Sequence, residues 1–228
     1  MTQSYGGMQM SKIGVFDSGV GGKSVANAIE AALPEHQVLF RNDVEHVPYA
    51  TRTPEEIKGF VVPILQSLAA DGCDVIVVAC NTVSTTLIEQ LRAIIPVPLV
   101  AVEPMVKPAV ALTKTKVIAV CATPTTLASP RYAWLKQEYA EGITVIEPDC
   151  SNWSYLIENN LINRQHIDTG LESALQAGAD VIVLGCTHYH WIEEEIKAAV
   201  GNKAIVVQPE AAVVRQVERL LTEIEPRA

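Results

Sequence analysis

The chain has 228 residues, of which 49% are hydrophobic and 19% are charged, and its formal net charge is −9. It can bury a substantial apolar core, as one domain or two small ones. The negative charge argues against a broad electrostatic interaction with nucleic acid, and no apolar run reaches the roughly 18 residues of a membrane helix. The opening MTQSYGGMQM lacks the features of a secretory signal. We therefore expect a cytoplasmic protein without a nucleic-acid or membrane partner.

Short apolar runs rich in β-branched residues alternate along the chain with longer stretches of helical periodicity. This alternation is typical of βαβ units around a mainly parallel sheet. The predicted strands span residues 13–16, 37–41, 74–79, 99–102, 116–120, 144–147, 180–184 and 204–207. The predicted helices span residues 23–32, 54–71, 82–94, 125–138, 165–177, 190–200 and 211–223.

An internal repeat is the most informative feature of the sequence. GCDVIVVAC at residues 72–80 aligns with GADVIVLGC at residues 178–186, and six of the nine positions are identical. IGVFDS at residues 13–18 matches IAVCAT at residues 118–123 at nearly the same offset. We therefore expect an α/β fold of two pseudo-symmetric parallel-sheet domains with the active site between them. The expected domains are residues 1–97 plus 208–228, and residues 98–207.

Each repeat ends in a cysteine, Cys80 or Cys186, where a predicted strand gives way to a helix. Because ligands of open parallel sheets bind beyond the carboxyl ends of the strands, the two thiols would face one cleft from opposite sides. Two symmetry-related groups suit the inversion of a carbon acid, since one removes a proton from one face and the other donates to the opposite face. A thiol, with an unperturbed pKa of about 8.5, can serve because a helix N-terminus favours the thiolate.

Polar residues flank both cysteines and suit the same chemistry. Asn81 and Thr82 follow one cysteine, and Thr187 and His188 follow the other. Their side chains and the nearby main-chain donors could hold a carboxylate. Asp17, at the end of the first predicted strand, and His188 are placed to assist the two thiols. Taken alone, Asp17 could equally belong to a helix-capping segment.

Three segments resemble the signature segments of the glutamate racemase family: DSGVGG at residues 17–22, ACNT at residues 79–82 and GCTHY at residues 185–189. DVEHVPY at residues 43–49 resembles the family's substrate-side loop. The segment from Cys150 to Glu158 resembles the family segment that carries a glutamate in the C-terminal half. The resemblance runs from about residue 13 to residue 212.

The resemblance implies an aspartate/glutamate racemase-like fold, interconversion of L- and D-glutamate for cell-wall peptidoglycan, and a homodimer. It also implies that the enzyme uses no pyridoxal phosphate, other cofactor or metal. By position, Cys80 and Cys186 are the paired bases, and Asp17, Glu158 and His188 assist them. The expected substrate contacts are Ser18, Pro48, Tyr49, Ala50, Asn81, Thr82, Thr123 and Thr187.

The sequence departs from the family pattern at three positions. Lys23 stands where the family usually has an apolar residue, Ala50 where it has Gly, and His190 where it has Pro. Aspartate or another amino acid therefore stays open as the substrate. A protein of the same shape that binds an acidic ligand with little catalysis is the alternative of a different class.

The sequence does not contain a phosphate-binding loop, because the first position of that motif does not match. GGKS at residues 21–24 resembles the end of GxxxxGK followed by Ser or Thr, but Asp17 replaces the first glycine and would repel a phosphate. The dinucleotide pattern GxGxxG fails because Ser24 stands at its last position.

The five cysteines include no CxxC pair and predict neither a disulfide framework nor a zinc site. We expect Cys73, Cys121 and Cys150 to be packing residues, and His190 has no assigned role.

Overall fold

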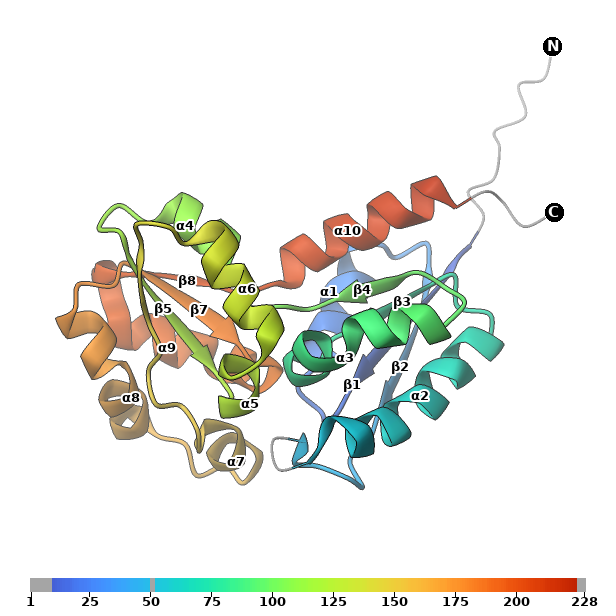
Figure 1. The fold of residues 1–228 in the computed structure, drawn as a ribbon, viewed down its shortest axis with the longest axis horizontal. Helices are drawn as coiled ribbons and strands as arrows, with labels where there is room; N and C mark the ends of the chain where they lie inside the picture. Colours follow the sequence, from blue (N-terminus) through green and yellow to red (C-terminus); the bar gives the residue numbers. More distant parts are fainter. Residues whose placement is uncertain (1–9, 50–51, 225–228) are drawn as a thin grey trace, which may run out of the picture.

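The protein, described by a computed structural model over residues 10–49 and 52–224, contains two four-stranded parallel sheets (Figure 1). The first has the order β2-β1-β3-β4, from β1 (Lys12–Asp17), β2 (Gln37–Asn42), β3 (Val75–Val78) and β4 (Leu99–Ala101). The second has the order β6-β5-β7-β8, from β5 (Val117–Ala122), β6 (Thr144–Ile146), β7 (Val181–Gly185) and β8 (Ile205–Val207). The shared strand order confirms the prediction of two similar α/β halves, since β3 and β7 occupy equivalent places.

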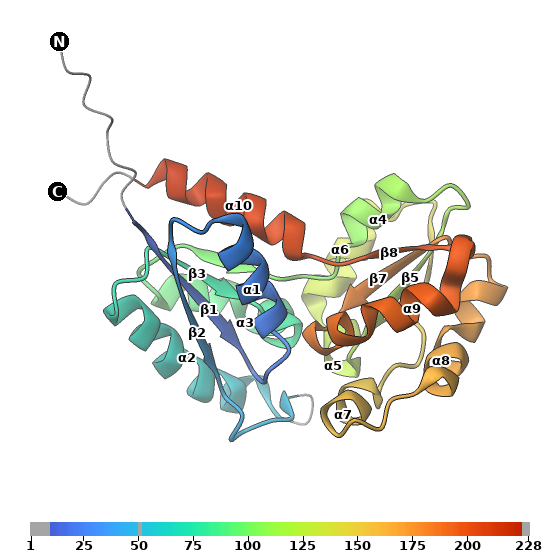
Figure 2. The ribbon, with the colours of Figure 1, turned by 180° about the vertical axis from the view of Figure 1, so that it is seen from behind.

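Helices cover both faces of the first sheet because its strands bury side chains on both sides. Helices α2 (Pro54–Ala70) and α3 (Asn81–Ile94) pack on the face that carries Phe16 and Ile76. Helices α1 (Lys23–Ala32) and α10 (Glu210–Glu223) pack on the opposite face, which carries Ile13 and Val75 (Figure 2). Each such large apolar side chain contributes about 1.5–3 kcal/mol when it is fully buried.

The second sheet is covered in the same way. Helices α7 (Trp153–Glu158), α8 (Arg164–Gln176) and α9 (Glu193–Val200) pack on one face, around Ile182 and Leu184. Helices α4 (Val106–Leu112) and α6 (Pro130–Tyr139) pack on the other, around Ile118 and Val120. The short elements α5 (Pro124–Leu127), η2 (Thr187–Ile192) and η3 (Gly201–Lys203) lie in the connections.

The last helix, α10, follows the second sheet along the chain but packs on the first. Val213 and Val217 are buried in one cluster with Ile13, Val75 and Ile29. The chain therefore passes between the halves twice, once after β4 and once between β8 and α10 (Figure 1). These two connections set how the halves lie against each other.

The predicted helices differ from the observed ones at four places. The helix expected over residues 125–138 is two helices, because Pro130 lacks an N–H and Ser129 caps a new helix by accepting from the Tyr132 N–H. The helix expected from residue 190 begins at Glu193, after the 3₁₀ turn η2. Helices α4 and α7, of seven and six residues, were not predicted because so few residues show little periodicity.

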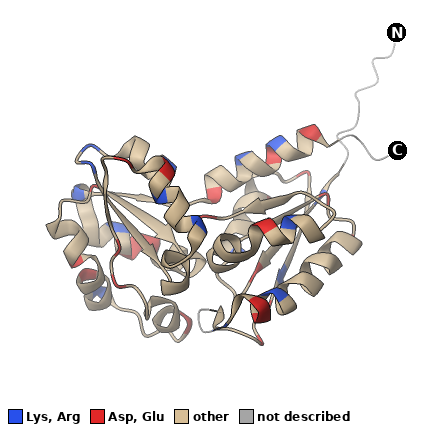
Figure 3. Ribbon diagram, viewed as in Figure 1, with Lys and Arg blue, Asp and Glu red and all other residues tan. Residues whose placement is uncertain are grey.

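Acidic and basic residues are interspersed along the ribbon of both halves (Figure 3). Within the described ranges, no helix combines the length and the apolar character needed to cross a membrane.

Candidate active site

A cavity of about 210 Å³ lies between the two halves. The ends of β1, β3 and β7 and the helix α7 surround it, as expected for a site at the carboxyl edges of parallel sheets. The side chains that line it are Ser18, Val47, Pro48, Tyr49, Cys80, Asn81, Thr82, Thr123, Ser154, Tyr155, Glu158, Cys186, Thr187 and His188.

Eleven of the thirteen site residues expected from the sequence line this cavity. Of the other two, Asp17 is fully buried beside it, and Ala50 lies outside the described residues. Val47, Ser154 and Tyr155 line the cavity without having been predicted. Ser154 and Tyr155 carry no sequence signal of their own and belong to α7, a helix that was not predicted.

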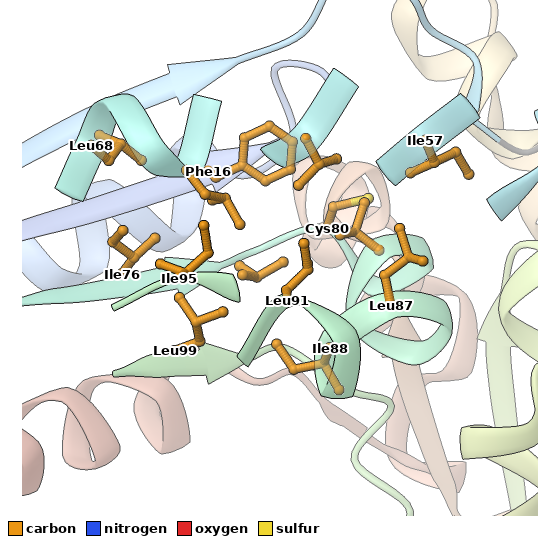
Figure 4. Packing of buried hydrophobic residues seen from close by; sticks show 14 of the residues in the cluster. Phe16, Ile57, Leu68, Ile76, Cys80, Leu87, Ile88, Leu91, Ile95 and Leu99 are labelled. Carbon is orange, nitrogen blue, oxygen red and sulfur yellow. The ribbon is translucent and has the colours of Figure 1, made fainter. Parts of the chain in front are cut away.

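Cys80 is the N-cap residue of α3 and is 5% exposed. It belongs to the apolar cluster that packs between the first sheet and helices α2 and α3 (Figure 4). Its Sγ lies 3.2 Å from the Ser18 Oγ. Burial, followed by the nearby negative charge of Asp17, raises the pKa of the Cys80 thiol to about 12. Cys80 is therefore protonated at neutral pH and is in the form that donates a proton.

Asp17 connects the two halves beneath the cavity. Its Oδ2 accepts hydrogen bonds from the Gly19 N–H at 3.2 Å and the Gly22 N–H at 3.0 Å. Its Oδ1 accepts from the Thr187 hydroxyl of the other half at 3.4 Å. A Cβ on Gly22 would lie 2.5 Å from the Asp17 Cβ, and one on Gly21 would lie 2.7 Å from the Thr187 Oγ1. Gly22 thus allows the loop to close on Asp17, and Gly21 allows the close approach of the other half, which explains the glycine-rich segment without a phosphate.

Cys186 lies between β7 and η2, next to an ion pair. Its Sγ is 3.5 Å from the Ser154 Oγ and 3.8 Å from the His188 Nδ1. The His188 Nε2 is 2.7 Å from the Glu158 Oε1. Burial lowers the pKa of His188, but hydrogen bonds to Cys186 and Glu158 outweigh it and raise that pKa to about 10. The hydrogen bond to His188 lowers the pKa of Glu158, so the pair is ionic at neutral pH.

The two thiols therefore have similar geometry and different electrostatics. Each Sγ has a serine hydroxyl within reach, Ser18 for Cys80 and Ser154 for Cys186. Cys80 has a buried carboxylate as its charged neighbour, whereas Cys186 has an imidazolium. A thiol beside a carboxylate on one side and a thiol beside a cation on the other are suited to one proton donor and one proton acceptor.

Asn81 is the clearest candidate for a ligand-binding group in the cavity. It is 4% exposed, and neither its Oδ1 nor its Nδ2 has a hydrogen-bond partner among the described residues. Buried polar atoms are almost always hydrogen-bonded, so an amide without a partner in a cavity points to a polar ligand. Nearby, the hydroxyls of Thr82 and Thr123 meet across the two halves at 3.3 Å. No Lys or Arg is among the described residues that line the cavity, so neutral donors and His188 would hold an anionic group.

The loop that carries Tyr49 is held by a buried carboxylate. The Tyr49 hydroxyl donates to the Asp43 Oδ2 at 2.6 Å, and the Asp43 Oδ1 is 2.7 Å from the His46 Nδ1. Burial and the bond to Asp43 raise the pKa of Tyr49 well above its ordinary value, so the phenol stays protonated. His46 also stacks on Phe60, with ring centroids 3.9 Å apart. Asp43 thus supports the cavity wall through Tyr49.

The remaining cysteines are buried packing residues, as predicted. Cys73, Cys121 and Cys150 are at most 1% exposed and lie in the apolar clusters of the two halves. In the part of the chain that the structure describes, no three His, Cys, Asp or Glu side chains are grouped so that they could hold a metal ion.

The ion pair between His188 and Glu158 gives a pH-dependent contribution to stability. We expect Glu158→Gln to lower the free energy of unfolding by about 1 kcal/mol, a value reduced for the partial exposure of Glu158. The raised pKa of His188 contributes stability fully below pH 6.5, and this contribution is lost as the pH rises through about 10. The lowered pKa of Glu158 contributes above pH 4.5 and is lost at lower pH.

Urea denaturation of wild type and variant as a function of pH tests this expectation. The difference should be largest between about pH 4.5 and 6.5 and should vanish above about pH 10. Asp168→Asn, which breaks the exposed Arg164–Asp168 pair, is the control. Arginine stays charged over this range, so the control should show no loss between pH 6.5 and 10. An equally flat profile for Glu158→Gln would contradict the assignment.

The fold and the cavity define an α/β protein in which two similar halves share one site. The sequence profile of the Asp/Glu/Hydantoin racemase family matches residues 22–217, and the chain belongs to this family. The glutamate racemase of Cupriavidus pinatubonensis is 38% identical over 215 residues, which are 92% of this chain and 79% of that protein. The protein is an isomerase of the glutamate racemase type.

Solved structures agree with this membership. The crystal structure of Escherichia coli glutamate racemase in complex with L-glutamate and the activator UDP-MurNAc-Ala matches with a TM-score of 0.88 and 29% identity, covering 96% of this chain and 85% of that one. The Francisella tularensis glutamate racemase in complex with D-glutamate matches with a TM-score of 0.80 and 26% identity, covering 93% and 81%.

Proposed function

We propose that the protein interconverts L- and D-glutamate by proton transfer to and from Cys80 and Cys186, without a cofactor. One observation carries the proposal: the cysteines of the two sequence repeats line a single cavity from opposite halves of the molecule. The relatives that are named glutamate racemases, and the L- and D-glutamate bound in two of the related structures, support glutamate as the substrate. The D-glutamate formed would supply peptidoglycan, which serves cell-wall biogenesis and cell shape.

The proton transfers follow from the two environments. In one direction the Cys186 thiolate, next to the His188 imidazolium, removes the α-proton, and the Cys80 thiol gives its proton to the opposite face. Cys80 is then a thiolate and Cys186 a thiol, which is the protonation state that the other enantiomer requires. Asp17, near Cys80, and His188, near Cys186, are the neighbouring groups that can return each cysteine to its starting protonation state.

The carbanion-like transition state needs donors at the substrate carboxylate. Asn81, Thr82, Thr123 and Thr187 line the cavity and can donate, and the N-terminus of α3 points main-chain N–H groups toward the same place. Such fixed donors act strongly in a site that excludes water, since the local dielectric is low. The ordinary barrier to removing an α-proton would be lowered by these contacts together with the two thiols.

We further propose that residues 1–97 plus 208–228 and residues 98–207 act as two domains that part to admit substrate. The packing of α10 on the first sheet supports this division, and a site between two halves needs an opening step. A homodimer in the cytoplasm belongs to the same proposal and rests on the family resemblance.

Proton exchange tests the reaction and its substrate together. The purified protein is incubated in D₂O with L-glutamate, D-glutamate, L-aspartate or L-alanine, and the α-proton signal and the enantiomer ratio are followed. We expect exchange with inversion for both glutamate enantiomers. Inversion of aspartate or alanine instead would replace the substrate and keep the mechanism, whereas no exchange with any of the four would favour an acidic-ligand binding protein.

A further inference from the structure

His190 is a buried histidine outside the cavity that contacts two elements of the other half. Its side chain is 1% exposed, and its Nδ1 lies 2.8 Å from the Glu210 Oε1 and 3.2 Å from the Ser24 Oγ. Glu210 is the first residue of α10, and Ser24 lies in the first turn of α1. Both helices pack on the first sheet, whereas His190 belongs to η2 at the end of the second. The cluster therefore crosses between the halves.

The position of this cluster along the chain connects it to both thiols. η2 begins directly after Cys186 and carries Thr187 and His188, so His190 is fixed to the segment that holds the second thiol. Helix α1 follows directly on the loop from Asp17 to Gly22, which contacts Cys80 through Ser18. Glu210 comes immediately after the chain has passed from β8 back to the first half. The cluster therefore joins the segments that carry the two thiols.

The chemistry of the cluster makes it a firm contact rather than a surface ion pair. Glu210 is placed at a helix N-terminus, where a carboxylate is stabilised by the helix dipole. Burial raises its pKa, but the hydrogen bonds to His190 and Ser24 outweigh this and lower it, so Glu210 is ionised. The His190 Nε2 and the Glu210 Oε2 are buried and have no partner among the described residues. Removing one member would leave further buried polar atoms unpaired, which gives the pair one preferred geometry.

We propose that the Ser24–His190–Glu210 cluster is an interdomain tie that holds Cys186 at its working position relative to Cys80. His190 and Glu210 are then positioning residues for the proton transfers. This inference rests on the proposed two-thiol racemisation and adds residues that lie outside its cavity. It also gives a role to His190, at which the sequence departs from the resembled family.

The test compares two fates of one intermediate. With L- or D-glutamate in D₂O, the intermediate is either inverted or returns to the starting enantiomer. Return is seen as deuterium in the starting enantiomer when the thiol that took the α-proton has exchanged it with D₂O before giving a hydrogen back. The ratio of return to inversion does not depend on how much of the enzyme is folded, so a merely structural role leaves it unchanged. We expect His190→Leu to lower kcat by about 10- to 100-fold, since a misplacement of about 1 Å has an effect of this size. The return-to-inversion ratio should change severalfold, with KM within about threefold of wild type.

Matched variants separate the tie from general destabilisation. His190→Asn can place a polar atom where Nδ1 lies and should restore both kcat and the ratio to within about threefold. Glu210→Gln keeps the side-chain volume. If His190→Leu does not fold, the return-to-inversion ratio is measured on Glu210→Gln instead. The control is Glu103→Gln, which breaks the Arg131–Glu103 ion pair near the other connection between the halves and should leave the ratio unchanged.

Three outcomes are decisive. A changed ratio in His190→Leu or Glu210→Gln, with rescue by His190→Asn, supports the tie. A variant that loses thermal stability or kcat while its ratio stays at the wild-type value overturns the inference and leaves the racemisation intact. A wild-type protein that exchanges neither enantiomer overturns the proposed function and the tie with it.

Discussion

Replacing Cys80 or Cys186 by serine is expected to reduce racemisation by at least about 10³-fold, because each direction of the reaction needs both thiols. A serine hydroxyl is a far weaker acid than a thiol, so it can neither form the base nor donate efficiently. A positioned acid or base contributes about 10²–10⁴-fold. The effect should fall on kcat, since Asn81 and the threonines that would bind the carboxylate remain in place.

The two cysteine variants should differ in what they still exchange. Cys80→Ser keeps the thiol of Cys186 and should still exchange the α-proton of one enantiomer in D₂O, while Cys186→Ser should exchange only the other. The control is Cys73→Ala, which removes a buried thiol of the first half that does not line the cavity. Full racemisation by either serine variant would rule out the two-base mechanism.

Asp17→Asn is expected to lower kcat by about 10²–10³-fold with little change in KM. An asparagine Oδ1 can still accept from the Gly19 and Gly22 N–H groups, so the loop should keep its conformation. What the variant loses is the buried negative charge beside Cys80. Because that charge raises the pKa of Cys80, its removal should shift the pKa below about 12.

The two effects of Asp17→Asn can be measured separately. Steady-state kinetics gives kcat and KM, and the rate at which iodoacetamide alkylates Cys80, followed by mass spectrometry against pH, reports the thiol pKa. Asp17→Ala removes the hydrogen bonds as well and should lower stability in addition. Wild-type activity in Asp17→Asn would mean that Asp17 only shapes the loop, as a capping residue does.

The repeat made the fold and the two thiols predictable from the sequence. Strand and helix periodicities are local, and two copies of one strand-to-cysteine segment indicated two equivalent strands, which are observed as β3 and β7. The resemblance added Glu158, which lies 30 residues from His188 and would not have been connected to it otherwise. Short elements were harder to predict because they show little periodicity. Helix α7 has only six residues, so Ser154 and Tyr155 were not predicted, although both line the cavity.

The sequence by itself determined the α/β class, the duplicated half and the place of Cys80 and Cys186 at strand ends, because these depend on local periodicity and on similarity within one chain. Tertiary structure alone decided which side chains meet across the halves. The Asp17–Thr187 bond joins residues 170 positions apart, and the Ser24–His190 contact joins residues 166 apart. It also decided the pKa of Cys80 and of His188, since desolvation and charge proximity are set by packing and have no local signature in the sequence.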